Sequence, residues 1–307
     1  MKHVISCEQF SRSALEQLFV HTDEIRNNPE KYADSLKNKI VATIFYEPST
    51  RTRLSFEAAI MRLGGKNISV ENAKEASSAI KGESIEDTVR VVQGYCDAIV
   101  MRHYDKNSAV DAANVATVPI FNAGAGSGEH PTQGLLDMYT IFRHKGAVDG
   151  ISVAVVGDLL YGRTVHSLVK LLALYEDVKI YGLSCDALKL PQEYIDYIES
   201  RGCKYFPCQS FADIPADVDA IYQTRTQLER FEDIDIEVCE FVIDSNVMNR
   251  FSNATILLHP LPRNAEIAAE VDNDPRALYF QQTHNGMYIR MALLSGALNQ
   301  GDFAENT

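Results

Sequence analysis

The stretch Phe45-Tyr46-Glu47-Pro48-Ser49-Thr50-Arg51-Thr52-Arg53-Leu54-Ser55-Phe56-Glu57 is a strand-like run that breaks at proline and continues as a helix. Apolar residues then recur at helical spacing until Gly64-Gly65 ends the pattern. The first N–H groups of a helix are unpaired and carry partial positive charge, so an oxyanion is stabilised there. Arg51 adds a planar donor fork that matches a phosphate group. The alternating hydroxyl and arginine side chains favour a phosphate site over an ordinary capped helix, and its candidate residues are Ser49, Thr50, Arg51 and Thr52.

Short β-branched runs alternate with longer amphipathic segments along the whole chain. The runs that we predict to be strands are residues 40–46, 67–70, 98–101, 118–122, 151–156, 178–182, 220–223 and 255–259. Such alternation is typical of βαβ units, in which a parallel sheet is covered by helices. The predicted class is therefore α/β, with a parallel sheet flanked by helices in each domain.

The length of 307 residues exceeds the size at which a single core usually stops growing, so two domains are expected. The strand pattern pauses between residues 122 and 150, where a glycine-rich turn leads into a predicted helix at 132–144. We expect a first domain of residues 1–131 plus 286–307, a linking helix at 132–145, and a second domain of residues 146–285. A terminal helix at 287–298 would return to the first domain, so helices join the two.

Composition excludes several classes of protein. The formal net charge of −13 disfavours a nucleic-acid surface or an anionic membrane surface, because both need extended basic faces. Six cysteines are scattered without a CxxC pair, which is typical of reduced cytosolic thiols rather than of disulfides or a zinc site. The N-terminus lacks the apolar core of a signal peptide, and no apolar run reaches membrane-spanning length. We therefore expect a cytoplasmic protein with no nucleic-acid or membrane partner.

The candidate polar residues follow predicted strands. Residues 49–53, Arg102, His130, Arg225 and residues 261–262 all come just past the C-terminal end of one. Ligands of open α/β sheets bind at those ends, so the shared position indicates function rather than chance.

Two glycine-containing turns were candidates for a dinucleotide site. In residues 124–133 the glycines are followed by Glu129-His130-Pro131, and residues 157–163 read Gly-Asp-Leu-Leu-Tyr-Gly-Arg. Neither turn therefore has the spacing GxGxxG. Nicotinamide binding is therefore disfavoured, and neither a metal nor a cofactor is expected. His130 and Gln133 lie three residues apart at a helix start, where both can face one polar pocket.

Arg163 and Arg225 follow two strands of the predicted second domain. Each guanidinium can take one carboxylate in a bidentate contact, so the pair suits a dicarboxylate. Surface salt bridges are the alternative for either arginine alone. Lys81 lies in a small polar loop, and the residues around it give it no role of its own.

Three motifs together resemble the aspartate/ornithine carbamoyltransferase family: Ser49-Thr50-Arg51-Thr52-Arg53, His130-Pro131-Thr132-Gln133 and His259-Pro260-Leu261-Pro262-Arg263. Residues 157–168, 223–227 and 279–282 further resemble its aspartate branch, and the likeness runs almost end to end. The ornithine branch typically has a cysteine where Pro260 stands, and it has a Ser-Met-Gly element that is absent here.

The resemblance implies roles for the matching residues. Ser49, Thr50, Arg51 and Thr52 would hold the phosphate of carbamoyl phosphate, with help from Arg102. Thr52, Arg102 and His130 would donate to its carbonyl oxygen. Gln133 and the backbone carbonyls of Leu261 and Pro262 would hold its amino group. Arg163, Arg225 and Gln227 would bind aspartate, and Ser77 and Lys81 would be lent by the adjacent chain of a trimer.

The implied reaction transfers the carbamoyl group of carbamoyl phosphate to the α-amine of L-aspartate, giving N-carbamoyl-L-aspartate and phosphate, in pyrimidine biosynthesis. A homotrimer with shared sites is implied, and some bacterial relatives add regulatory chains to form an allosteric dodecamer. One alternative is a carbamoyltransferase for ornithine or another amine, which the arginine pair disfavours. A non-catalytic relative is the other, and it is disfavoured because every motif position is filled.

Overall fold

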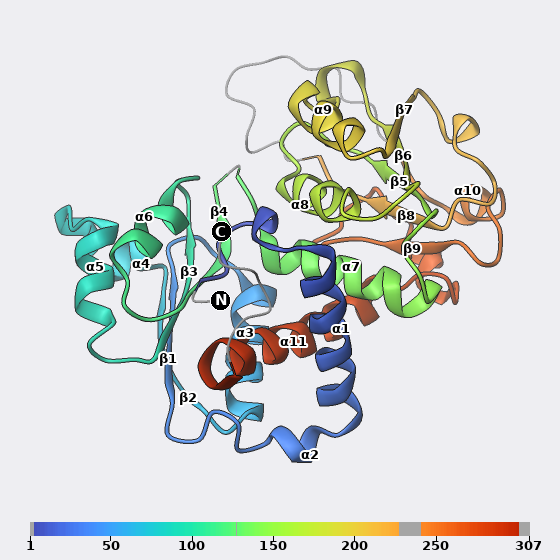
Figure 1. Cartoon of the computed structure of the whole chain (residues 1–307). Helices are drawn as coiled ribbons and strands as arrows, with labels where there is room; N and C mark the ends of the chain where they lie inside the picture. Colours follow the sequence, from blue (N-terminus) through green and yellow to red (C-terminus); the bar gives the residue numbers. More distant parts are fainter. Residues whose placement is uncertain (1–2, 127, 227–240, 301–307) are drawn as a thin grey trace. The chain divides into compact units, whose positions relative to one another are not determined.

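The structure is a computed structural model that describes residues 3–126, 128–226 and 241–300. The chain divides into two compact units, Met1–Leu136 with His284–Thr307 and Asp137–Thr283 (Figure 1). Each unit has a parallel sheet of its own. The division falls inside α7 (Pro131–Lys145) and α11 (Tyr279–Ser295), so each of these helices belongs to both units. The predicted class, two α/β domains joined by helices, is confirmed.

The sheet of the first unit has four parallel strands in the order β2-β1-β3-β4. Their bounds are β1 Ile40–Phe45, β2 Lys66–Glu71, β3 Ala98–His103 and β4 Ile120–Ala125. The inner strand β1 is buried along almost its whole length, as expected for a strand covered on both faces. The edge strand β2 is mostly exposed.

Helices cover both faces of this sheet. Before α7 the chain forms α1 Arg12–Asn27, α2 Pro29–Tyr32, α3 Thr50–Arg62, α4 Ala73–Ala76, α5 Ile85–Val92 and α6 Ser108–Val115, with 3-10 turns at Cys7–Gln9 and Ser78–Lys81. Val89 of α5 and Ala112 of α6 pack with Ile44 and Met101 in one apolar cluster. On the opposite face of the sheet lies α3 (Figure 1), whose Phe56 ring centroid is 6.3 Å from that of Phe121.

The C-terminal part of α11 packs within the first unit. Arg26 donates a 2.6 Å hydrogen bond to Asn285, and the Arg290 guanidinium lies 5.0 Å from the centre of the Phe56 ring. The predicted return of the terminal helix to the first domain is therefore confirmed. A short π-helical turn, Gly296–Gln300, follows α11.

The sheet of the second unit has five parallel strands in the order β7-β6-β5-β8-β9. Their bounds are β5 Ser152–Val156, β6 Lys179–Leu183, β7 Lys204–Cys208, β8 Ala220–Gln223 and β9 Ile256–Leu258. The accompanying helices are α8 Arg163–Leu172, α9 Gln192–Ser200 and α10 Ser245–Met248, with 3-10 turns at Asp186–Leu188, Phe211–Asp213 and Ala269–Asn273. Ile221 and Leu257 of the sheet pack against Met248, Val271 and Tyr279 in one buried cluster.

Three local predictions were wrong. The edge strand β7 was not predicted, because it is largely exposed and contains Pro207, which weakens the strand signal. Arg102 lies within β3 and not past its end. The terminal helix begins at Tyr279 and not at residue 287, so Gly286 lies inside it. A Cβ atom at Gly286 would come within 2.6 Å of the Arg290 guanidinium and 2.8 Å of the Leu136 side chain, so both neighbours leave little room for a side chain there.

None of the helices in the described residues is both long and apolar enough to cross a membrane.

Candidate active site

In the first unit, the N-terminus of α3 lacks a side-chain cap. Ser49 is its N-cap residue, but the Ser49 side chain makes no capping hydrogen bond to the helix. The Ser49 hydroxyl instead accepts a 3.3 Å hydrogen bond from Arg102. The first-turn N–H groups of α3 are therefore not used by this cap, which is the arrangement that binds an oxyanion. Thr50 and Arg51 are exposed at this turn.

The guanidinium of Arg102 lies beside the same turn. In the register of the two strands, Arg102 of β3 is paired with Phe45, the last residue of β1. Besides Ser49, it donates a 3.2 Å bond to the carboxylate of Glu47. Two positive side chains, Arg51 and Arg102, thus follow the end of β1 or lie next to it, where they can neutralise a phosphate.

His130 is brought to the same place by a third segment. It is buried, and its Nε2 atom lies 3.4 Å from the hydroxyl oxygen of Thr52 in the first turn of α3. The preceding residue is fixed as well, because the carboxylate of Glu129 accepts a 2.6 Å bond from the backbone N–H of Cys7. Gln133 is half-buried in the first turn of α7. The structure thus brings together His130 and Thr52, two of the residues predicted from the sequence.

Ser77 and Lys81 lie on another segment of the first unit. The Ser77 hydroxyl caps the 3-10 turn Ser78–Lys81 by accepting a 3.2 Å bond from the N–H of Ala79. Lys81 ends this turn and is exposed. The loop expected there from the sequence is therefore a short helical turn that presents a lysine to solvent.

In the second unit, Arg163 is the first residue of α8 and is 8% exposed. The turn before it is set by glycine and aspartate. Gly157 has φ +113°, and a Cβ atom there would lie 2.4 Å from the carbonyl oxygen of Thr224. The buried Asp158 accepts a 2.8 Å bond from the N–H of Tyr161, while its own N–H donates to the Thr224 hydroxyl. Asp158 was not among the predicted site residues, although its place between Gly157 and Arg163 was a usable signal.

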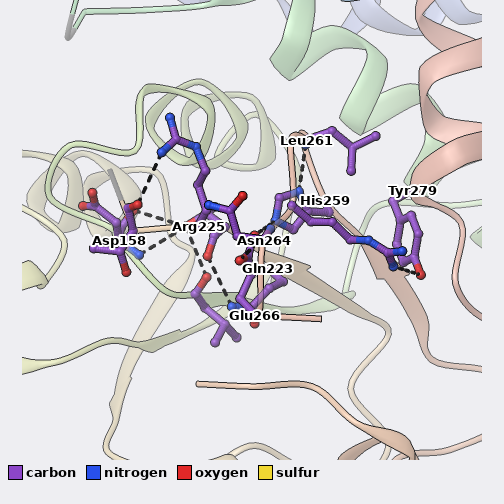
Figure 2. A network of polar contacts seen from close by, with 12 residues as sticks. Asp158, Gln223, Arg225, His259, Leu261, Asn264, Glu266 and Tyr279 are labelled. Atoms are coloured by element: carbon purple, nitrogen blue, oxygen red, sulfur yellow. Dashed lines mark hydrogen bonds and ion pairs between the residues drawn. The ribbon is translucent and has the colours of Figure 1, made fainter. Parts of the chain in front are cut away.

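Arg225 lies two residues past β8, the strand paired with β5. It is half-buried, and its guanidinium donates a 3.4 Å bond to the carbonyl of Thr226 (Figure 2). Arg163 and Arg225 thus follow two neighbouring strands, β5 and β8, with Arg163 inside α8 and not in the turn before it. Gln227 lies outside the described residues.

Past β9, the chain makes an unusual turn. Leu261 has φ +56° and is joined to Pro262 by a cis peptide bond. His259, Asn264 and Glu266 form a hydrogen-bonded group around this turn (Figure 2). The pKa of Glu266 lies below its ordinary value: burial opposes this shift, but the hydrogen bonds from His259 and from backbone N–H groups outweigh it. His259 and Glu266 had no assigned role in the sequence prediction.

Two family models match most of the chain. The model described as "Aspartate/ornithine carbamoyltransferase, carbamoyl-P binding domain" matches residues 2–143, and the one described as "Aspartate/ornithine carbamoyltransferase, Asp/Orn binding domain" matches residues 149–296.

Individual proteins are similar over nearly the whole length. Aspartate carbamoyltransferase 2, chloroplastic, of Pisum sativum is 48% identical over 299 residues, which cover 95% of this chain and 77% of that protein. The aspartate carbamoyltransferase catalytic subunit of Methanocaldococcus jannaschii is 45% identical over 312 residues, which cover 98% of this chain and 100% of that protein. A crystal structure of aspartate transcarbamoylase from Trypanosoma cruzi with carbamoyl phosphate and aspartate has a TM-score of 0.87 at 38% identity, covering 96% of this chain and 95% of that one.

Proposed function

Since this chain belongs to the aspartate/ornithine carbamoyltransferase family, we propose that it performs the reaction of the aspartate branch. It transfers the carbamoyl group of carbamoyl phosphate to the α-amine of L-aspartate and releases N-carbamoyl-L-aspartate and phosphate, a step of pyrimidine biosynthesis. The observation that carries the choice of aspartate is the pair Arg163 and Arg225 after adjacent strands, because two guanidinium groups match two carboxylates.

Carbamoyl phosphate is assigned to side chains of the first unit and to two backbone carbonyls of the second. Ser49, Thr50, Arg51 and Thr52 hold its phosphate at the N-terminus of α3, and Arg102 assists. Thr52, Arg102 and His130 donate to the carbonyl oxygen, and the 3.4 Å contact between Thr52 and His130 supports this grouping. Gln133 and the carbonyls of Leu261 and Pro262 accept from the amino group.

The chemistry is a direct attack. The neutral amine of aspartate adds to the carbonyl carbon, a tetrahedral intermediate forms, and phosphate leaves with the C–O bonding electrons. The amine loses a proton, for which the departing phosphate is a suitable acceptor. Negative charge develops on the carbonyl oxygen, so donors already aimed at that atom stabilise the transition state.

Aspartate is assigned to Arg163, Arg225 and Gln227. We assign the domains by the substrate that each binds. The carbamoyl phosphate domain comprises residues 1–131 and 286–307, the aspartate domain comprises residues 146–285, and residues 132–145 link them. The two compact units of the structure, Met1–Leu136 with His284–Thr307 and Asp137–Thr283, have bounds close to these.

We further propose a homotrimer in which Ser77 and Lys81 complete the site of an adjacent chain. The exposed position of Lys81 suits such a role. Apolar side chains are also exposed on α3 and on the edge strand β2, namely Leu54, Met61 and Ile68. Assembly with regulatory chains into an allosteric dodecamer and a cytoplasmic location belong to the same proposal, and the scattered cysteines favour a reducing compartment.

Substitution of Arg225 tests the assignment of the second unit. Arg225→Ala should raise the KM for aspartate by about 10²-fold or more, because a bidentate charge-assisted contact is lost. Arg225→Lys should recover only part of the loss, since lysine lacks the fork. The KM for carbamoyl phosphate should stay within about threefold in both variants. An unchanged aspartate KM in Arg225→Ala would remove this arginine from the site.

A further inference from the structure

His259 is a buried histidine whose two ring nitrogens are both used. It lies directly after β9 and is 1% exposed. The backbone N–H of Leu261 donates a 2.8 Å bond to Nδ1, and Nε2 lies 2.8 Å from a carboxylate oxygen of Glu266. Since Nδ1 accepts an N–H, the proton of the neutral ring is on Nε2 and is donated to Glu266. The tautomer is therefore fixed by its two partners.

The bond to Nδ1 holds a residue in an unfavourable backbone conformation. Leu261 has φ +56°, the left-handed region, which is unfavourable for a residue with a Cβ atom. Such conformations persist where surrounding bonds determine them and are concentrated at ligand-binding sites. The carbonyls of Leu261 and Pro262, which follow this N–H, are the groups assigned to the carbamoyl amino group.

The histidine is itself held firmly. Its backbone N–H donates a 3.0 Å bond to Gln282, whose amide donates a 2.6 Å bond to the buried carboxylate of Asp137. The second oxygen of Asp137 accepts a 2.7 Å bond from the hydroxyl of Tyr222 in β8. The far side of the turn is held too, because Glu266 accepts a 3.0 Å bond from the N–H of Asn264. All of these residues belong to the second unit.

We propose that His259 is a positioning residue for carbamoyl transfer: as a neutral imidazole with its proton on Nε2, it holds the Leu261 backbone so that the carbonyls of Leu261 and Pro262 select the amino group of carbamoyl phosphate. The inference rests on the proposed function. His259 acts through Leu261 and does not itself touch the substrate, because its ring nitrogens are engaged on both sides.

Two substitutions separate the two ring nitrogens. In His259→Asn, the side-chain oxygen takes the place of Nδ1 and can still accept from the N–H of Leu261. In His259→Gln, the amide reaches toward Glu266 and leaves the Leu261 N–H without that acceptor. The same change at the exposed His284, His284→Gln, is the control.

The measurement compares two ligands in the full chain with aspartate present: the KM for carbamoyl phosphate and the inhibition constant of acetyl phosphate, which has a methyl group in place of the amino group. We expect His259→Gln to weaken carbamoyl phosphate about 10-fold or more and to lower kcat by about 10²-fold, since small misplacements have effects of that size. Acetyl phosphate binding should stay within about twofold, because its methyl group needs no acceptor. His259→Asn should keep most of the wild-type preference for carbamoyl phosphate.

Equal weakening of both ligands in His259→Gln, or wild-type preference in that variant, would overturn the proposal. If His259→Gln does not fold, loss of the preference in a folded His259→Asn would overturn it as well. Failure of the proposed function has a different signature, because the wild-type chain would then form no carbamoyl-aspartate.

Discussion

At the level of single residues, the polar side chains at the N-terminus of α3 bond to other side chains and do not cap the helix. Ser49 accepts a bond from Arg102 instead of capping α3, and Thr52 contacts His130. Both choices leave the backbone donors of the first turn available to an anion. The exposed Arg51 beside them is the residue proposed to neutralise this anion.

Removing Arg51 should therefore impair carbamoyl phosphate binding and turnover together. For Arg51→Ala we expect kcat/KM for carbamoyl phosphate to fall by about 10²–10³-fold, the size seen when one preorganised donor is lost. Steady-state kinetics at saturating aspartate measure this change in kcat/KM. Arg62→Ala, at the exposed other end of α3, is the matched control and should be neutral. Equal kinetics in the two variants would refute the phosphate assignment.

At the level of elements, the turn from β5 to α8 determines where Arg163 lies. Gly157 approaches Thr224 so closely that no side chain fits between them, and Asp158 bonds to the same threonine. The turn is thus tied to the residue that precedes Arg225 in the chain. These contacts therefore link the turn that leads to Arg163 with the residue before Arg225.

A methyl group at Gly157 should disturb this arrangement. We expect Gly157→Ala to lower the melting temperature by several degrees and to raise the KM for aspartate, because both a close contact and an unfavourable φ are introduced. Gly150→Ala is the control: its φ is +73°, but its Cβ atom would meet nothing within 4 Å. If both variants raise the aspartate KM equally, the contact with Thr224 is not what positions the arginines.

The segment before α11 is held by an acid-sensitive ion pair. Asp274 lies 2.6 Å from Arg276, which also donates bonds of 2.9 and 3.1 Å to the carbonyls of Met248 and Phe251. The hydrogen bond from Arg276 holds the pKa of Asp274 below its ordinary value of 3.8. A lowered pKa in the folded state adds stability above the ordinary pKa, and this stability is lost as pH falls through the folded-state value.

Asp274→Asn should consequently lower the urea midpoint at pH 7 and flatten the fall in stability below about pH 4. The two curves should converge at the acid end of the titration. Glu199→Gln, at an exposed acid of α9 in the same unit, is the control. Parallel pH curves for Asp274→Asn and the wild type would show that the pair does not contribute in this way.

Sequence alone was sufficient for elements with local signals. The buried strands, the N-terminus of α3 and the two arginines after β5 and β8 all follow from patterns a few residues long. The contacts of Asp137 were out of reach, because its partners Tyr222 and Gln282 are 85 and 145 residues away in the chain. The contacts of His259 could not be predicted for the same reason, since its burial and its bond to Gln282 appear only in the fold.

At the level of the whole molecule, an acidic chain has to bind two anions. The net charge of −13 repels carbamoyl phosphate and aspartate at long range, so the arginines gathered at strand ends must outweigh it locally. The proposed trimer would add Lys81 of an adjacent chain to these charges.

Mixing two inactive variants tests that sharing. Lys81→Ala and Arg51→Ala chains should each be nearly inactive alone. After dissociation and reassembly of an equal mixture, about one site in four should be complete, because each site draws on two independent chains of a symmetric ring. A mixture of Arg51→Ala with His130→Ala is the control and should regain no activity, since these residues are assigned to one chain's own part of the site. No recovery in the first mixture would contradict shared sites.

The activity proposed for this chain is the carbamoylation of aspartate. The most direct test is to incubate the purified chain with carbamoyl phosphate and either L-aspartate or L-ornithine, and to measure the ureido product by colorimetry. We predict product with aspartate alone, together with release of an equal amount of phosphate. Product with ornithine alone, or with neither amine, would contradict this activity.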